Sequence, residues 1–211
     1  MDNLIISVGR QLGSGGCDIA KRLAQDFGCK YYDTELINLA AERSGFNPKI
    51  FAKQDESHGT LKSLFGSVSG RLGRSMSNFY SNSMSQESLF QIQSEAIWKA
   101  AKDDDCVFVG RCADYVLRSK PGLFSIFITA DDEVRIKEVA GRLNCDNETA
   151  RRYIQKKESE RANYYNYYTS KKWGAAQSYN LCINSSLFGI DRTTEIIAQI
   201  IREHRENQTK I

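Results

Sequence analysis

The stretch LIISVGRQLGSGGCDIAKRL, residues 4–23, decides the fold. It starts with an apolar run, passes through a turn rich in glycine, and ends in an amphipathic helix expected from about Asp18 to Phe27. This order is typical of a strand, a phosphate-binding loop and a helix. Glycines let the backbone approach an anion closely, and the helix adds the positive end of its dipole. The stretch therefore predicts phosphate binding; the alternative is a plain strand-to-helix turn that needs glycine for packing.

The turn departs from the usual phosphate-binding motif G-x-x-x-x-G-K-[ST]. If Gly15 is the second glycine of the motif, Arg10 stands at the first, Gly16 replaces the lysine and Cys17 replaces the hydroxyl residue. A thiol is a poor ligand for magnesium, which prefers hard oxygen atoms. Arg10 is the nearest cation, and its planar fork of donors could replace the lysine on the phosphates.

Length and composition limit the class of protein. A chain of 211 residues is long enough for one large domain or a domain with a lid, and a net charge of +3 does not by itself indicate nucleic acid. The six cysteines show no C-x-x-C spacing, which favours free thiols in a reducing compartment over disulfides or zinc. No segment approaches the roughly 18 apolar residues of a membrane helix, so we expect a cytoplasmic protein with no membrane partner.

Further apolar runs predict the remaining strands. They lie at residues 106–109, 124–128 and 181–184, with a short β-prone segment at 29–32. Helical spacing of apolar residues predicts helices at about 18–27, 35–42, 88–101, 133–143, 147–161 and 190–204. Five strands that alternate with helices predict an α/β fold with a doubly wound, parallel, five-stranded sheet. The acidic triplet 103–105 precedes a strand, so we interpret it as a solvated turn and not as a metal site.

Polar residues at the carboxyl ends of strands are candidates for the site. Gly110 and Arg111 follow a buried strand, where a backbone N–H and a guanidinium could hold a phosphate. Asp114 could orient Arg111, bind a sugar hydroxyl or support magnesium; the alternative is an Arg–Asp pair that caps the next helix. Asp33 is interpreted first as a helix N-cap and second as a contact to a nucleotide.

Two segments could cover a substrate. Residues 57–85, rich in Ser, Gly, Asn and Met, predict a cap, while a surface loop or a subunit contact in a homo-oligomer stays open. Between Arg135 and Lys172 there are ten basic and five acidic residues, which favours a lid that closes on polyphosphate over a solvated helix. The run of tyrosines from Tyr164 to Tyr168 is more typical of packing than of nucleic-acid binding.

Taken together, these motifs resemble the cytidylate kinase-like family, relatives of the bacterial cytidylate kinases among the P-loop nucleoside monophosphate kinases. The segments that carry the resemblance are RQLGSGG at 10–16, YDTELI at 32–37, GRCAD at 110–114, RANYY at 161–165 and YNLCINS at 179–185. The resemblance implies a single P-loop domain over 1–211. Its core would comprise 1–56, 86–134 and 174–204, with a helical cap at about 57–85 and a lid at about 135–173.

The resemblance also implies a function and a set of site residues. The chain would move the γ-phosphate of ATP, with Mg²⁺, to a nucleoside monophosphate similar to CMP or dCMP, or to a similar small acceptor. The alternative is a catalytically silent nucleotide sensor, favoured by the missing lysine. The donor phosphates would be held by Gly13, Ser14, Gly15, Gly16, Cys17 and Asp18. The catalytic cations would be Arg10, Arg111, Arg152 and Arg161, and the acceptor would contact Asp33, Arg111, Asp114 and Lys156.

Overall fold

The computed structural model describes residues 3–34, 36–38 and 77–208. The chain divides into two compact units, residues 1–34 with 98–211 and residues 35–97. The first unit contains the sheet and the candidate site.

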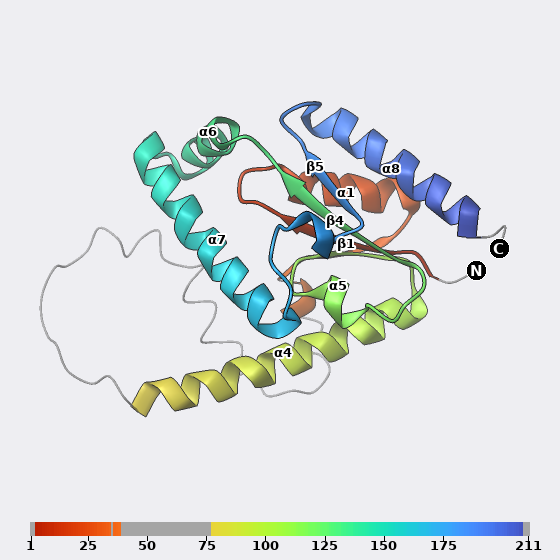
Figure 1. Ribbon diagram of the computed structural model, residues 1–211, viewed down its shortest axis with the longest axis horizontal. Helices are drawn as coiled ribbons and strands as arrows, with labels where there is room; N and C mark the ends of the chain where they lie inside the picture. The colour runs from red at the N-terminus through yellow and green to blue at the C-terminus, as the bar shows by residue number, and fades with distance from the viewer. Residues whose placement is uncertain (1–2, 35, 39–76, 209–211) are drawn as a thin grey trace, which may run out of the picture. The chain divides into compact units, whose positions relative to one another are not determined.

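The sheet of the first unit has five parallel strands. They are β1 (Ile5–Arg10), β2 (Lys30–Tyr32), β3 (Cys106–Val109), β4 (Leu123–Thr129) and β5 (Leu181–Asn184). Their spatial order is β2-β3-β1-β4-β5, and Figure 1 labels the neighbours β1, β4 and β5. The predicted parallel sheet is therefore confirmed, and the loops after β1 and β3 lie side by side because these strands are neighbours.

Alternate residues of the strands point to the two faces of the sheet. On one face Ile6, Val8 and Ile126 pack in one apolar cluster with α1 (Gly16–Phe27) and α8 (Gly189–Gln208) (Figure 1). The other face includes Phe127, whose ring lies 5.0 Å from that of Trp173 and 4.9 Å from that of Tyr179. Both faces are thus covered, as a parallel sheet requires.

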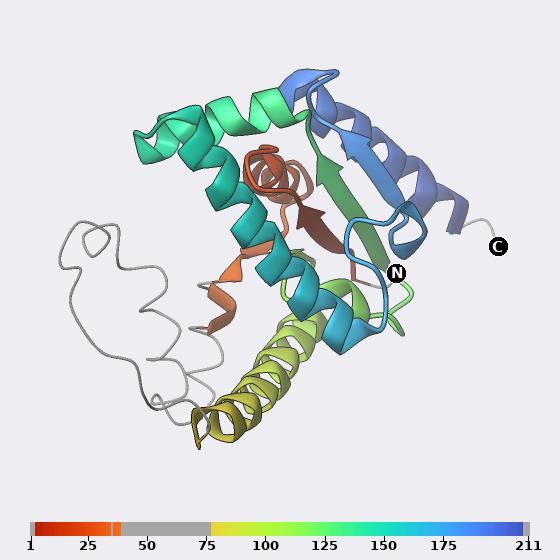
Figure 2. The ribbon, with the colours of Figure 1, turned by 60° about the vertical axis from the view of Figure 1, so that its left-hand side comes forward.

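Helices α6 (Asp132–Leu143) and α7 (Asn147–Thr169) form a hairpin that lies beside the end of β1 (Figure 2). Ile136, Val139 and Ile154 form its small core, against which Leu12 of the loop packs. The helix predicted at about residues 147–161 was expected to end too early, because α7 continues through the tyrosine run to Thr169. In that run Tyr165 is buried and its ring stacks on Tyr179, which agrees with the expected packing, whereas Tyr167 is 68% exposed. The short helix α5 (Ala113–Val116) was not predicted.

The second unit contains residues 36–38, which are helical, and the first part of α4 (Ser77–Asp103). The predicted apolar side of this helix is buried at Leu89, Ile92 and Ile97. Helix α4 begins earlier than the predicted residue 88, so residues 77–85 of the predicted cap are helical. The rest of that cap, and residues 39–42 of the predicted second helix, lie outside the described residues. Within the described ranges no helix is both long and apolar enough to cross a membrane.

Candidate active site

The loop after β1 presents unpaired backbone amides at the start of α1. Gly15 is the N-cap of this helix, in the left-handed conformation, and no side chain caps the helix. Within the described part of the chain, the N–H groups of Gly13, Gly15, Gly16 and Cys17 donate no hydrogen bond. Free amides that meet the positive end of a helix dipole form a site for an anion.

Hydrogen bonds from two serines hold this loop in place. The Ser14 hydroxyl donates to the Gln11 carbonyl at 2.9 Å. The hydroxyl of Ser185, which follows β5, donates to the Ser14 carbonyl at 2.8 Å. Both serines are buried, so the shape of the loop is set by the chain's own contacts.

Arg10 extends from this loop to the turn after β3. A Cβ atom placed on Gly16 would lie 2.5 Å from the Arg10 Cβ, and one placed on Gly110 would collide with the Arg10 guanidinium. The Arg10 Nε atom is buried and has no hydrogen-bond partner among the described residues. Burying a guanidinium nitrogen without an acceptor is costly, so Arg10 is a candidate to bind an anionic group.

The turn after β3 has three consecutive residues with positive φ. They are Gly110 at 77°, Arg111 at 53° and Cys112 at 56°. Glycine adopts such angles freely, whereas each of the other two costs on the order of 1 kcal/mol or more. Strain of this kind is concentrated at functional sites.

Arg111 lies over the ring of Tyr164, with 5.3 Å between the guanidinium carbon and the ring centre. Its Nε atom is also buried and unpartnered among the described residues. Burial raises the pKa of Tyr164, while the charge of Arg111 opposes that rise. The tyrosine therefore positions the guanidinium, both through its ring and through a side-chain hydrogen bond with Arg111.

Arg161 on α7 contacts Arg10, whose guanidinium reaches Gly110, the residue before Arg111. Its Nη1 atom donates to the Arg10 carbonyl at 3.3 Å. Burial, together with the charge of Arg10, lowers the pKa of Arg161 to about 10, which still leaves it charged at neutral pH. None of the ion pairs in the described part of the chain involves these three arginines. We call Arg10, Arg111 and Arg161 the arginine cluster.

Asp114 does not pair with Arg111. It is buried and accepts a hydrogen bond of 2.7 Å from the Tyr165 hydroxyl. Burial raises the pKa of Asp114, and the bond from Tyr165 opposes that rise. Asp114 thus connects the strained turn to α7, and the alternative of an Arg–Asp pair is not what the structure shows.

The other predicted site residues lie apart from the cluster or at its border. Asp33 directly follows β2, at the same edge of the sheet as Arg10 and Arg111. Arg152 and Lys156 are exposed on α7, and Arg152 lies 3.8 Å from Glu148. In the described part of the chain, no hydrogen bond or ion pair joins either of them to the loop or the turn. The assignment of all these residues to a ligand stays a prediction.

Sequence reasoning did not assign two pairs of residues to the positions in which they shape the site. Tyr164 and Tyr165 hold Arg111 and Asp114, and they follow Arg161 at the three- and four-residue spacing that shares one helix face. Arg135 and Glu158 bind the loop at Leu12. The helical spacing could have revealed the tyrosines, whereas nothing local to Arg135 or Glu158 indicates their target.

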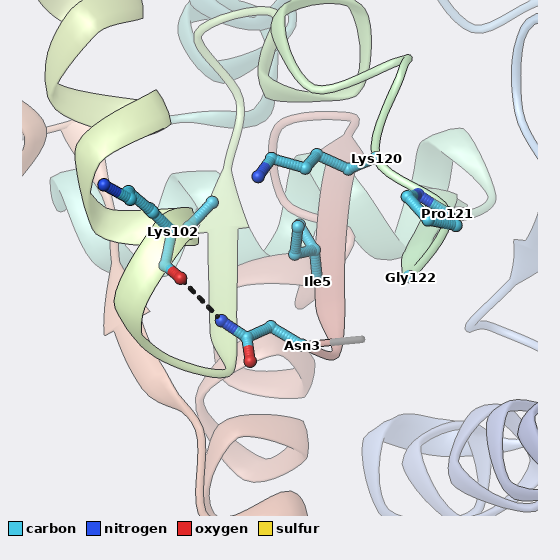
Figure 3. Close-up of a pocket in the computed structure, with 7 residues that line it drawn as sticks. Asn3, Ile5, Lys102, Lys120, Pro121 and Gly122 are labelled. Atoms are coloured by element: carbon cyan, nitrogen blue, oxygen red, sulfur yellow. Dashed lines mark hydrogen bonds between the residues drawn. The ribbon is translucent and has the colours of Figure 1, made fainter. Parts of the chain in front are cut away.

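Two other features lie at the opposite, N-terminal edge of the sheet. In the acidic triplet, Asp104 pairs with Lys30 and Asp105 accepts from the Leu4 N–H at 2.7 Å. A cavity of about 200 Å³ lies beside the start of β1, between Lys102 and Lys120 (Figure 3). Both features are therefore separate from the arginine cluster. Among the described residues no group of three or more His, Cys, Asp or Glu is placed to hold a metal ion.

Comparison with known proteins agrees with this architecture. The chain is 26% identical over 208 residues to a cytidylate kinase from Methanopyrus kandleri, an alignment that covers 94% of this chain and 93% of that protein. A crystal structure of an uncharacterized protein from Eubacterium ventriosum matches with a TM-score of 0.69 and 27% identity, over 95% of this chain and 99% of that one. A gluconokinase from Sinorhizobium meliloti shares the fold alone, with a TM-score of 0.56, 11% identity and coverage of 98% and 95%.

The sequence also matches a described family over residues 5–187, which includes the loop, the strained turn and the α6–α7 hairpin. The predicted resemblance and the P-loop kinase fold are both confirmed. The chain belongs to the cytidylate kinase-like family.

Proposed function

We propose that this protein transfers the γ-phosphate of ATP to a nucleoside monophosphate of the cytidylate type. Family and fold support a nucleotide-binding phosphotransferase. The observation that carries the proposal is the arginine cluster, in which two buried Nε atoms have no partner among the described residues. A dianionic phosphate would supply the missing acceptors and neutralise the cluster, because guanidinium groups match phosphate oxygens in charge and geometry.

The donor phosphates would bind the amides of Gly13–Cys17. Beside that loop, Leu187 and Phe188 are 71% and 48% exposed, and they precede Ile190, whose side chain would lie 2.9 Å from a Cβ on Gly15. Exposed apolar side chains at the border of an anion site suit a ligand that has both phosphates and a flat base, as ATP does.

Arg10 would act between the two nucleotides. Its side chain starts beside Gly16 of the loop and ends at Gly110 of the strained turn. The phosphoryl group would travel between these two points, so Arg10 would stabilise negative charge in the transition state. Such transfer depends on positioning and on charge neutralisation more than on a side-chain nucleophile.

Magnesium fits this site only through oxygen ligands that the substrate brings. Cys17 stands where a P-loop hydroxyl would bind the ion, and sulfur is a poor ligand for it. The ion would therefore be held by phosphate oxygens and water, and would add to the charge neutralisation that the arginines provide.

A coupled assay of ADP formation with ATP, Mg²⁺ and a panel of nucleoside monophosphates tests the proposal. We expect turnover with CMP or dCMP, and a loss of about a hundredfold or more in kcat/KM for Arg111→Gln. No turnover with any acceptor, from folded protein, would reject the transferase function. ATP binding in calorimetry without product would instead select the silent sensor.

A further inference from the structure

Both helices of the α6–α7 hairpin bind the same residue of the phosphate loop, Leu12. Arg135 on α6 donates from Nε to the Leu12 carbonyl at 3.0 Å. Glu158 on α7 accepts from the Leu12 N–H at 3.1 Å. The Leu12 side chain packs against the apolar core of the hairpin. Every part of this residue is therefore held by the two helices.

Arg135 and Glu158 also bind each other. The Arg135 Nη2 atom lies 2.5 Å from the Glu158 carboxylate, and its Nη1 atom lies 3.0 Å from Asp132. The side chain of Arg135 is 4% exposed and that of Glu158 is 18% exposed. A buried pair of this kind imposes geometry, because either partner left alone would be a desolvated charge.

The contact reaches the amides that would hold phosphate. Gly13 follows Leu12 and has a φ of 82°, and a Cβ there would lie 2.7 Å from the Arg135 carbonyl. Only glycine permits this close approach of the loop to α6. The position of Gly13, where the free amides begin, is thus fixed by the same helix turn that supplies Arg135.

We propose that Arg135 and Glu158 are positioning residues for the donor nucleotide, and that they hold the loop amides in the geometry that binds its phosphates. This inference rests on the proposed function. The role of Arg135 therefore differs from the role expected for the other cations of the hairpin. Its Nε, Nη1 and Nη2 atoms donate to Leu12, Asp132 and Glu158, which are groups of the protein itself.

The test is calorimetric titration of the full chain with two ligands separately, a non-hydrolysable ATP analogue and CMP. We expect Glu158→Ala to weaken binding of the analogue about tenfold and to change CMP binding by less than twofold. Glu158→Gln keeps an acceptor for the Leu12 N–H, so it should recover most of the lost affinity. Glu160→Ala is the matched control, because Glu160 lies on the same helix and pairs with Lys157 on the exposed side.

A second variant separates positioning from general stability. Arg135→Lys replaces the fork of donors by one point charge, and should also weaken the analogue selectively. If the pair acts as a unit, the double variant Arg135→Lys/Glu158→Ala should lose little more than Glu158→Ala alone. Equal losses for both ligands, or unchanged binding of the analogue by the folded variants, would overturn the inference. Failure of the unaltered protein to bind either ligand would instead reject the proposed function.

Discussion

Replacing Arg161 by glutamine should stabilise the protein when no ligand is present and remove its stabilisation by anions. In the folded protein the pKa of Arg161 falls well below its ordinary value, to about 10, first through burial and then through the charge of Arg10. The folded state therefore binds this proton less tightly than the unfolded state does. The resulting destabilisation is fully present at neutral pH, begins to be relieved as the pH rises above about 10, and disappears only above the pKa of the unfolded state.

The size of the effect follows from the pKa shift. At about 1.4 kcal/mol per unit, the shift corresponds to about 3 kcal/mol as an upper bound. Glutamine would lose part of the hydrogen bond to the Arg10 carbonyl, worth about 1 kcal/mol. The net gain in unfolding free energy is then about 1–2 kcal/mol, or roughly 2–8 °C in Tm for a chain of this length.

Thermal unfolding with and without inorganic phosphate measures both effects. Phosphate should stabilise the unaltered protein, by about 2.7 kcal/mol at a hundredfold excess over its Kd, and should have little effect on Arg161→Gln. Arg151→Gln is the control, because Arg151 is exposed on the same helix; its Tm and its response to phosphate should not change. A lower Tm for Arg161→Gln, or an undiminished response to phosphate, would refute the reasoning.

Three further outcomes are expected. Gly110→Ala should lower the unfolding free energy, measured by urea titration, by about 1–3 kcal/mol and should weaken CMP binding. The reason is that the new methyl group would collide with the Arg10 guanidinium and that alanine is strained at this positive φ. Unchanged CMP binding would contradict the position of Arg10 beside Gly110. Tyr165→Phe removes the hydrogen bond that opposes the rise in the pKa of Asp114, so this pKa should rise further. The variant's loss of unfolding free energy, measured in urea titrations, should therefore grow as the pH rises from 4 to 8, and a loss independent of pH would count against this. Cys17→Ser should increase kcat several-fold in the coupled assay with Mg²⁺, since a hydroxyl is a better ligand than a thiol, and an unchanged kcat would argue that the ion does not reach this position.

The sheet and the loop could be predicted from sequence because their signals are local. Apolar runs mark β1, β3 and β4, and the glycines after β1 mark the loop. The apolar side of α4 at Leu89 and Ile92 was equally clear from helical spacing. Each of these elements is defined by residues that lie close together in the chain.

The partners of polar side chains could not be predicted in the same way. The sequence leaves open whether Asp114 orients Arg111, binds a sugar hydroxyl or supports magnesium, and the partner that the structure shows is Tyr165, 51 positions later in the chain. Arg135 was grouped with cations that close on polyphosphate, yet it is buried against Glu158 and Leu12. Composition shows that a segment is basic, but only packing decides which of its charges remain available to a ligand.

The arginine cluster joins three stretches that are far apart along the chain, at residues 10, 111 and 161. An anion bound there would connect β1, the turn after β3 and α7 as a removable cross-link. Resistance to proteases would then rise and fall with the concentration of the ligand around the protein. The amount of intact enzyme in a cell would in this way follow the supply of its own substrate.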